Sequence, residues 1–237
     1  MKAVAVNGSA RGAKGVTGKL LAAFTAGLER GGAQVTVVNL KELTIAPCVA
    51  CLSCFHKTPG KCAQSDDMDK IYPLLKKSDL FVMATPVYTD SMTAQMKAMC
   101  DRCIPAMQPF LTPNPAGLTT HPAQWNMPAR TVLLSTCGFP EPAHFAPLKA
   151  TVRAQAKNFH GRVIGEFCVP GSIALQMDQT RLDNHLALLR QAGEQMAAQG
   201  KVNPALAADI NRPPLSTDQY LELAAKYEAW CSKNRQE

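Results

Sequence analysis

Short apolar runs and longer amphipathic segments take turns along the N-terminal part of the chain. Residues 3–6 and 34–40 have the length and β-branched content of buried strands. Between them, the segment from Thr17 to Gly31 carries apolar residues at helical spacing, namely Leu20, Leu21, Phe24 and Leu28. A strand, a helix and a second strand within about 40 residues predict a βαβ unit, with a right-handed crossover and a parallel sheet.

Three more apolar runs predict further strands, each with helical segments beside it. They span residues 79–84, 130–135 and 161–167. Five strands alternating with helices predict an α/β fold, in which a doubly wound, five-stranded parallel sheet carries helices on both faces. In such sheets, ligands bind at the carboxyl ends of the strands, near the point where the strand order reverses. The loops that follow the strands are therefore the candidate functional segments.

The length and composition of the chain suit a single domain with additions. Its 237 residues, 46% of them hydrophobic, predict one domain over residues 1–200. Residues 201–237 are expected to form a helical C-terminal extension of this domain, with helices at 204–210 and 217–230. The proline-rich segment 104–128 is longer than a minimal domain needs. It predicts an irregular insertion that covers the ligand site or contacts another subunit.

The loop after the first strand has the composition of a phosphate site. Its glycines let backbone N–H groups crowd around one point, and the helix from Thr17 directs its positive end there. The hydroxyls of Ser9 and Thr17 and the guanidinium of Arg11 add further donors. Gly18-Lys19 lacks the Ser or Thr of a Walker loop, and the glycine spacing differs from that of dinucleotide folds, so a mononucleotide is favoured. The alternative is an ordinary turn between strand and helix.

The charge and the hydropathy of the chain indicate which class of ligand it binds and in which compartment it is expected. The formal net charge of +7 is spread along the chain, and only 6% of the residues are aromatic. An anionic cofactor or substrate explains this balance more simply than nucleic acid does. No apolar run approaches 18 residues, which argues against a membrane span, and the N-terminus reaches a strand and a glycine loop too soon for a signal peptide. We therefore expect a cytoplasmic protein.

Four of the nine cysteines fall within the loop 47–62 that follows the second strand. Their spacing is Cys-x2-Cys-x2-Cys-x7-Cys, formed by Cys48, Cys51, Cys54 and Cys62. Three thiolates at three-residue steps can surround one side of an iron–sulfur cube, and the fourth can complete its coordination. A [4Fe-4S] cluster is the favoured interpretation. A zinc site with four thiolates and a set of unligated thiols are the alternatives.

Together these motifs resemble the flavodoxin-like NAD(P)H-dependent FMN reductases and, within them, the iron–sulfur flavoproteins. The resemblance covers about residues 1–145. It rests on Gly8-Ser9-Ala10-Arg11, the cysteine motif, Asp66-Asp67-Met68, Thr85-Pro86-Val87-Tyr88, Lys97 with Asp101-Arg102, and Cys137-Gly138.

The resemblance implies a sheet order of 2-1-3-4-5 and assigns roles to residues of three loops. It assigns the FMN phosphate to Ser9, Arg11, Val16 and Thr17. It implies that the isoalloxazine ring is bordered on one side by the turn Thr85-Pro86-Val87-Tyr88 and on the other by Thr136-Cys137-Gly138. It also implies that the four motif cysteines ligate a [4Fe-4S] cluster close to the flavin.

The implied activity is an FMN-dependent oxidoreductase that passes electrons between NAD(P)H and an acceptor, through the cluster. The flavin carries the reaction, so no catalytic side chain is expected. The acceptor is a small molecule or a partner protein, and a homo-oligomer, a dimer or a tetramer, is expected. The alternatives are a cluster-free NAD(P)H:FMN or quinone reductase, a flavodoxin-like electron carrier without enzymatic activity, and a flavin-free domain stapled by zinc.

Overall fold

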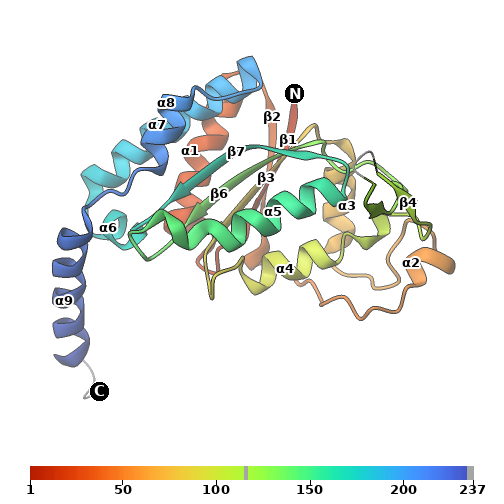
Figure 1. Cartoon of the computed structure of the whole chain (residues 1–237), viewed down its shortest axis with the longest axis horizontal. Helices are drawn as coiled ribbons and strands as arrows, with labels where there is room; N and C mark the ends of the chain where they lie inside the picture. Colours follow the sequence, from red (N-terminus) through yellow and green to blue (C-terminus); the bar gives the residue numbers. More distant parts are fainter. Residues whose placement is uncertain (115–116, 234–237) are drawn as a thin grey trace.

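A five-stranded parallel sheet forms the centre of the molecule. The computed structural model describes residues 1–114 and 117–233. The strands lie in the order β2-β1-β3-β6-β7 (Figure 1), and every adjoining pair is parallel. This is the order 2-1-3-4-5 along the chain, so the predicted doubly wound fold is confirmed. The strands are β1 (Lys2–Asn7), β2 (Gln34–Asn39), β3 (Leu80–Pro86), β6 (Arg130–Thr136) and β7 (Arg162–Val169).

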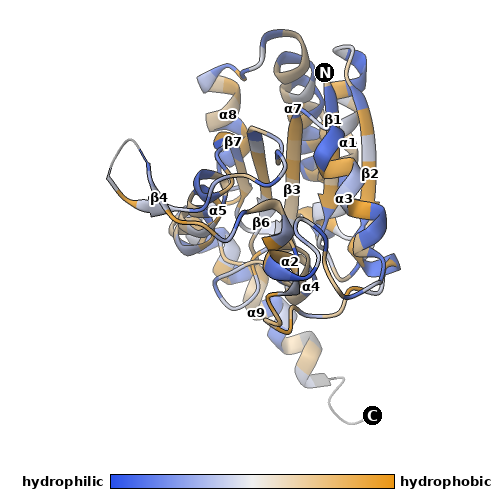
Figure 2. Cartoon of the chain, turned by 90° about the vertical axis from the view of Figure 1, so that its right-hand side faces the viewer, coloured by the Kyte–Doolittle hydropathy of each residue, from blue (hydrophilic) through white to orange (hydrophobic). Residues whose placement is uncertain are grey.

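Helices cover both faces of this sheet (Figure 1), and the side-chain alternation of the strands explains the two layers. In β1, Ala3 and Ala5 belong to one apolar core, whereas Val4 and Val6 belong to the other. The first core packs against α1 (Val16–Arg30), α7 (Gln179–Gln199) and α8 (Pro204–Asn211). The second packs against α3 (Met68–Lys77), α4 (Ala94–Asp101) and α5 (Ala146–Asn158). The hydropathy colouring of Figure 2 shows the strands as the apolar centre.

Helices α1 and α7 cross at glycines. A Cβ atom on Gly27 of α1 would lie 2.0 Å from the carbonyl oxygen of Arg190, and one on Gly193 of α7 would lie 2.1 Å from the carbonyl oxygen of Phe24. Neither position has room for a side chain, because the backbones of the two helices touch there. This contact fixes α1, and with it the loop that precedes α1.

The remaining elements are short, apart from the last helix. They are η1 (Gly12–Lys14), η2 (Leu40–Glu42), α2 (Ser53–His56), η3 (Ile104–Ala106), β4 (Thr112–Pro113), β5 (Thr119–Thr120), η4 (Pro142–Phe145), α6 (Ser172–Met177) and α9 (Thr217–Lys233). Strands β4 and β5 form a small antiparallel hairpin in the predicted insertion, of which Pro115 lies outside the described residues. Among the described helices, none combines the length and hydropathy that a membrane crossing requires.

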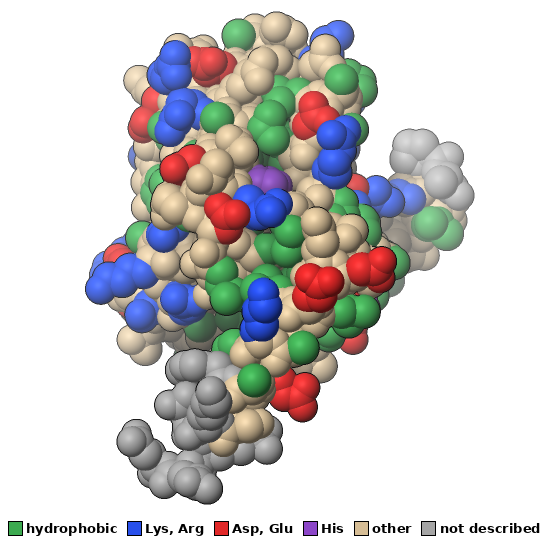
Figure 3. Space-filling model, turned by 90° about the vertical axis from the view of Figure 1, so that its left-hand side faces the viewer, with side chains coloured by type: hydrophobic (Ala, Val, Ile, Leu, Met, Phe, Trp, Pro, Cys, Tyr) green, Lys and Arg blue, Asp and Glu red, His purple; other side chains and the backbone are tan. Residues whose placement is uncertain are grey.

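Helix α9 extends away from the body of the molecule (Figure 1). Its first turn is attached through Tyr220, whose hydroxyl donates to the carbonyl oxygen of Gly138. The face seen in Figure 3 carries charges of both signs, interspersed with hydrophobic side chains. On this face, the formal charge of +7 is thus not gathered in one patch.

Candidate functional site

A cleft of about 190 Å³ lies at the carboxyl ends of the strands, where the prediction placed the ligand. Nine of the eleven predicted cofactor residues line it, namely Ser9, Arg11, Val16, Thr17, Pro86, Val87, Tyr88, Thr136 and Gly138. The other two, Thr85 and Cys137, are buried and are not among the lining residues. The rest of the lining comes from Gly15 and from Ser172, Ile173 and Gln176 of α6.

Hydrogen bonds within the loop between β1 and α1 fix its shape. Asn7 Oδ1 accepts the backbone N–H of Ser9 at 3.0 Å, and Ser9 Oγ accepts the N–H of Arg11 at 3.3 Å. The N-cap of α1 is Gly15, which provides no side-chain cap for the first-turn amides. A Cβ atom on Gly15 would lie 2.7 Å from Ser9 Oγ, so the loop closes tightly only around glycine. These donors and this shape fit a phosphate group.

Two further polar contacts join this loop to neighbouring parts of the cleft. Thr17 Oγ1 lies 2.8 Å from Thr136 Oγ1, which connects the first turn of α1 to the end of β6. Arg11 Nη1 donates to Gln176 Oε1 at 2.8 Å and so reaches α6 across the cleft. Two hydroxyls and a guanidinium therefore surround the place where the first-turn amides of α1 point.

The turn after β3 presents an aromatic ring at the edge of the cleft. Val87 N–H donates to the carbonyl oxygen of Thr136 at 2.8 Å, and Tyr88 and Ser91 exchange two backbone hydrogen bonds. Thr89 and Asp90 between them have φ angles of 47° and 57°, as a tight two-residue turn of this hand requires. Tyr88 is 50% exposed, so its ring is available to a flat ligand.

The loop after β6 connects the cleft to α6. Cys137 N–H donates to Val169 at 3.1 Å, and the carbonyl oxygen of Cys137 accepts the N–H of Ser172 at 2.8 Å. Cys137 is 3% exposed, and burial raises the pKa of its thiol. Cys137 therefore serves through its backbone. Sequence reasoning missed α6 because it did not read the loop after the fifth strand, where Gly171, with φ of +60°, marks a turn directly before the helix.

The four cysteines of the motif line a second cavity, of about 400 Å³. All four are free thiols. Burial raises the pKa of Cys54, and so does the charge of nearby Cys62, Cys51 and Cys48, which means that four thiolates would repel one another here. A cationic group that neutralises them would fit this donor set.

The arrangement of these thiols bears on the kind of metal group. In the described part of the chain, no three His, Cys, Asp or Glu side chains converge closely enough to hold a single metal ion. Each iron of a [4Fe-4S] cube takes one thiolate, so its four ligands must surround a cavity rather than a point. The four motif cysteines line one cavity in this way.

The predicted insertion packs on the cysteine loop and not on the cleft between β1 and β6. His121 lines the cysteine cavity, and its ring lies 5.7 Å from that of Phe55. Trp125 Nε1 donates to the carbonyl oxygen of Gly60 at 3.2 Å. Figure 1 shows β4 of the insertion and α2 of the cysteine loop at the same end of the molecule. Within one chain the segment therefore contacts the cysteine loop, and cover of the flavin and contact with another subunit both stay predictions.

The two cavities lie at opposite ends of α4 and share no lining residue. Thr93, the N-cap of α4, donates from Oγ1 to the carbonyl oxygen of Gly8 at 2.7 Å, beside the phosphate-type loop. Asp101 and Arg102, at the other end, line the cysteine cavity. Eight helical residues span about 12 Å. Within one chain α4 therefore lies between the two cavities, and a cluster close to the flavin stays a prediction.

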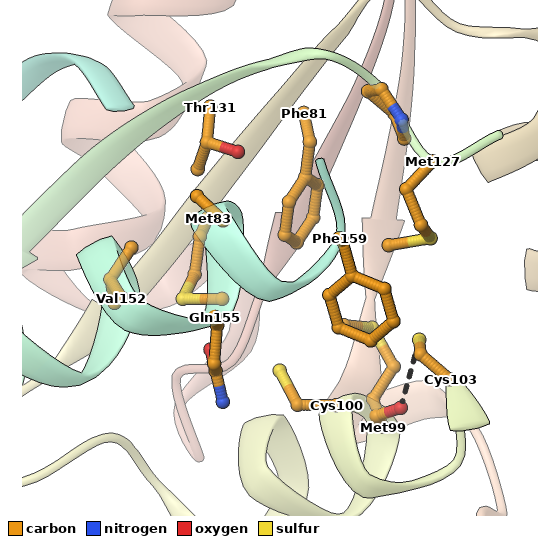
Figure 4. Close-up of a pocket in the computed structure, with 12 residues that line it drawn as sticks. Phe81, Met83, Met99, Cys100, Cys103, Met127, Thr131, Val152, Gln155 and Phe159 are labelled. Carbon is orange, nitrogen blue, oxygen red and sulfur yellow. Dashed lines mark hydrogen bonds between the residues drawn. The ribbon is translucent and has the colours of Figure 1, made fainter. Parts of the chain in front are cut away.

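A third, small cavity holds Cys100 and Cys103 (Figure 4). Both thiols lie among apolar side chains, including Phe81, Met83 and Phe159. Burial raises the pKa of Cys100 to about 12 and raises that of Cys103 as well. Cys103 Sγ donates to the carbonyl oxygen of Met99 at 3.4 Å. Thiols with raised pKa values in apolar surroundings are unreactive.

A doubly wound sheet with a phosphate-type loop at its carboxyl edge defines a mononucleotide-binding α/β fold. Residues 1–126 match the family model described as NADPH-dependent FMN reductase. This match covers more than half of the chain, which therefore belongs to that family of flavin oxidoreductases.

Part of the chain is similar to proteins that are named iron–sulfur flavoproteins. An iron–sulfur flavoprotein of Archaeoglobus fulgidus is 41% identical over 105 residues, which are 44% of this chain and 46% of that protein. One of Methanosarcina thermophila is 36% identical over 104 residues, 44% of this chain and 53% of that protein. The matched part thus spans about half the length of these relatives.

Solved structures support the fold at low sequence identity. A NAD(P)H:quinone oxidoreductase from Methanothermobacter marburgensis gives a TM-score of 0.59 at 14% identity, covering 82% of this chain and 95% of that one. An azoreductase from Bacillus anthracis gives 0.59 at 15% identity, covering 84% and 99%. These two proteins share the flavodoxin-like architecture of the whole domain.

Proposed function

We propose that this chain is an iron–sulfur flavoprotein, which uses FMN to pass electrons between NAD(P)H and an acceptor, by way of a [4Fe-4S] cluster. The observation that carries the proposal is the shared cavity of Cys48, Cys51, Cys54 and Cys62, in a chain of the FMN reductase family. The names of the similar iron–sulfur flavoproteins support it. The acceptor is a small oxidant or a redox protein.

The residues of the cleft have separate tasks in this proposal. Bound FMN would accept hydride and release electrons, which the protein itself need not do. The first-turn amides of α1, with Ser9 and Thr17, bind the phosphate, and Arg11 adds a positive charge. Tyr88, which is half exposed at the edge of the cleft, would lie along one edge of the ring system. The buried backbone of Cys137 holds α6 against the opposite side.

The cysteine loop decides between this proposal and its closest alternative, a cluster-free NAD(P)H:FMN or quinone reductase. The test is anaerobic purification, followed by an absorbance spectrum and assays of iron and acid-labile sulfide. We expect flavin bands with a broad visible shoulder and about four irons per chain. Cys51→Ser should lose the iron and keep the flavin. Cys231→Ser, which changes a cysteine of α9 outside the loop, is the matched control and should keep both.

Two results of this test would contradict the cluster. Flavin bands without iron in the wild-type protein would favour the cluster-free reductase. Stoichiometric zinc in a colourless protein would favour the structural zinc site instead. The homo-oligomer also stays a prediction, which light scattering on the loaded protein tests directly.

A further inference from the structure

Arg102 is a fully buried arginine at the wall of the cysteine cavity. It follows directly after α4, and its side chain has an exposed fraction of 0%. It lines the cavity together with the four cysteines of the motif. A buried guanidinium cannot lose its charge at ordinary pH, so the structure holds a permanent cation beside the thiols.

Most of the hydrogen-bonding capacity of Arg102 goes to the two ends of the cysteine loop. Nη1 donates to the carbonyl oxygen of Ala46 at 2.8 Å, just before the loop, and Nη2 donates to that of Gln64 at 3.2 Å, just after it. Both nitrogens also donate to Asp66, at 2.7 and 3.2 Å. Asp66 in turn accepts the N–H of Ala46 at 3.0 Å. One side chain thus joins the two stems of the loop.

The third nitrogen of the guanidinium, Nε, takes no part in these hydrogen bonds. It is buried and has no hydrogen-bond partner among the described residues. Such an orphan donor is costly unless something fills the site it faces. The Cys62 side chain lies close enough to the guanidinium to contribute to raising its pKa, against the lowering effect of burial and alongside Asp66. The orphan donor and the cysteine ligands therefore belong to one site.

We propose that Arg102 is a positioning residue for the group held by the four cysteines: it fixes both stems of the loop, donates Nε–H to a sulfur of that group, and raises its reduction potential. This inference rests on the proposed cluster. When such a group accepts one electron, it gains one negative charge, and no bond forms or breaks. A fixed cation and a hydrogen bond to sulfur stabilise the reduced form, which is one way that proteins set the potentials of iron–sulfur groups.

Substitutions in the ion pair between Arg102 and Asp66 should shift the midpoint potential in opposite directions, which allows a test. Asp66→Asn leaves the positive charge of Arg102 without its counterion and should raise the midpoint potential. The double variant Asp66→Asn/Arg102→Gln removes both charges, so it leaves no unpaired buried ion, and should lower the potential. Arg153→Gln changes an arginine paired with Glu166 outside the cysteine cavity, and it should leave the potential at the wild-type value.

The experiment is a dithionite titration of each reconstituted protein, followed by the electron paramagnetic resonance signal of the reduced cluster. Iron, sulfide, circular dichroism and thermal unfolding are measured on the same samples. We expect the ratio of reduced to oxidised cluster to change at least tenfold between the two Asp66 variants, which is about 59 mV for a one-electron couple. A folded double variant that loads less iron than Arg153→Gln would also support the positioning role.

Equal potentials in the wild type and both Asp66 variants would overturn the role of Arg102 and leave the cluster intact. A wild-type chain that loads no iron and sulfide would overturn the cluster and, with it, this inference. The two failures are therefore distinguished by the first measurement in the series.

Discussion

Thr17→Val tests whether the first turn of α1 binds the phosphate of the flavin. Thr17 is buried, lines the cleft, and has its hydroxyl 2.8 Å from that of Thr136. Valine has nearly the same shape but no hydroxyl, so the change removes one donor to the phosphate and leaves the helix in place. It also deprives Thr136 of its hydroxyl partner.

The expected loss follows from the charge of the ligand. A hydrogen bond to a charged group contributes about 1.5–3 kcal/mol. Since 1.4 kcal/mol is a factor of ten, the Kd for FMN should rise about 10- to 150-fold. The assay is a titration of apoprotein with FMN, followed by quenching of flavin fluorescence. Stability should fall by only about 1 kcal/mol, the loss expected for one neutral hydrogen bond.

Thr25→Val is the matched control on the same helix. Thr25 is also buried, and its hydroxyl donates to the carbonyl oxygen of Ala22 at 3.1 Å, about two turns beyond Thr17 and away from the cleft. This variant should lose a similar amount of stability and keep the wild-type Kd for FMN. Equal Kd values for Thr17→Val and the wild type, or equal weakening by both variants, would refute the assignment of the phosphate to this loop.

Three further outcomes follow from the packing, the ion pair and the buried thiols. Gly27→Ala should lower the free energy of unfolding by at least about 2 kcal/mol in urea denaturation, because its Cβ would meet the Arg190 carbonyl at 2.0 Å; an unchanged midpoint would contradict the glycine crossing. Although burial raises the pKa of Asp66, hydrogen bonds from Arg102 and from backbone amides hold it below its usual value, so its contribution to stability is present above about pH 4 and is lost on further acidification. Asp66→Asn should therefore cost about 3 kcal/mol at neutral pH, and the difference from the wild type should shrink below pH 4 in urea denaturation; a difference that stays constant with pH would oppose this. In native apoprotein at pH 8, mass spectrometry should find the loop thiols alkylated while Cys103, which is 1% exposed and whose pKa is raised by burial, reacts only after unfolding; early labelling of Cys103 would contradict its burial.

The sequence was sufficient for the sheet and for most of one cleft. Apolar runs of strand length, separated by amphipathic segments, fixed the five strands to within a few residues of β1, β2, β3, β6 and β7. The cleft followed because loops at the carboxyl ends of parallel strands must share one edge of the sheet. Thr85 and Cys137 were predicted to contact the cofactor but do not line the cleft. The sequence pattern at the end of a strand does not show which side chains point into the cleft and which point into the core.

Long-range packing was out of reach. Nothing in the spacing of the prolines says that the insertion covers the cysteine loop, since contacts such as Trp125 with Gly60 depend on the folded path of both segments. Asp66 accepts the N–H of Met68, two residues away, at 3.0 Å, but its pairing with Arg102 joins positions 36 apart in sequence. The separation of the two cavities by α4 likewise requires the three-dimensional structure.

The central claim is that electrons from a nicotinamide nucleotide enter at the flavin and reach the cysteine-bound cluster. Anaerobic mixing of the loaded protein with NADPH or NADH, followed by flavin absorbance and by electron paramagnetic resonance, tests it directly. We predict that the flavin is bleached and that the signal of a reduced cluster then appears, whereas Cys51→Ser shows the bleaching alone. A flavin that neither nucleotide bleaches would contradict the reductase and leave the flavodoxin-like carrier, and bleaching without a cluster signal in iron-loaded protein would remove the cluster from the path.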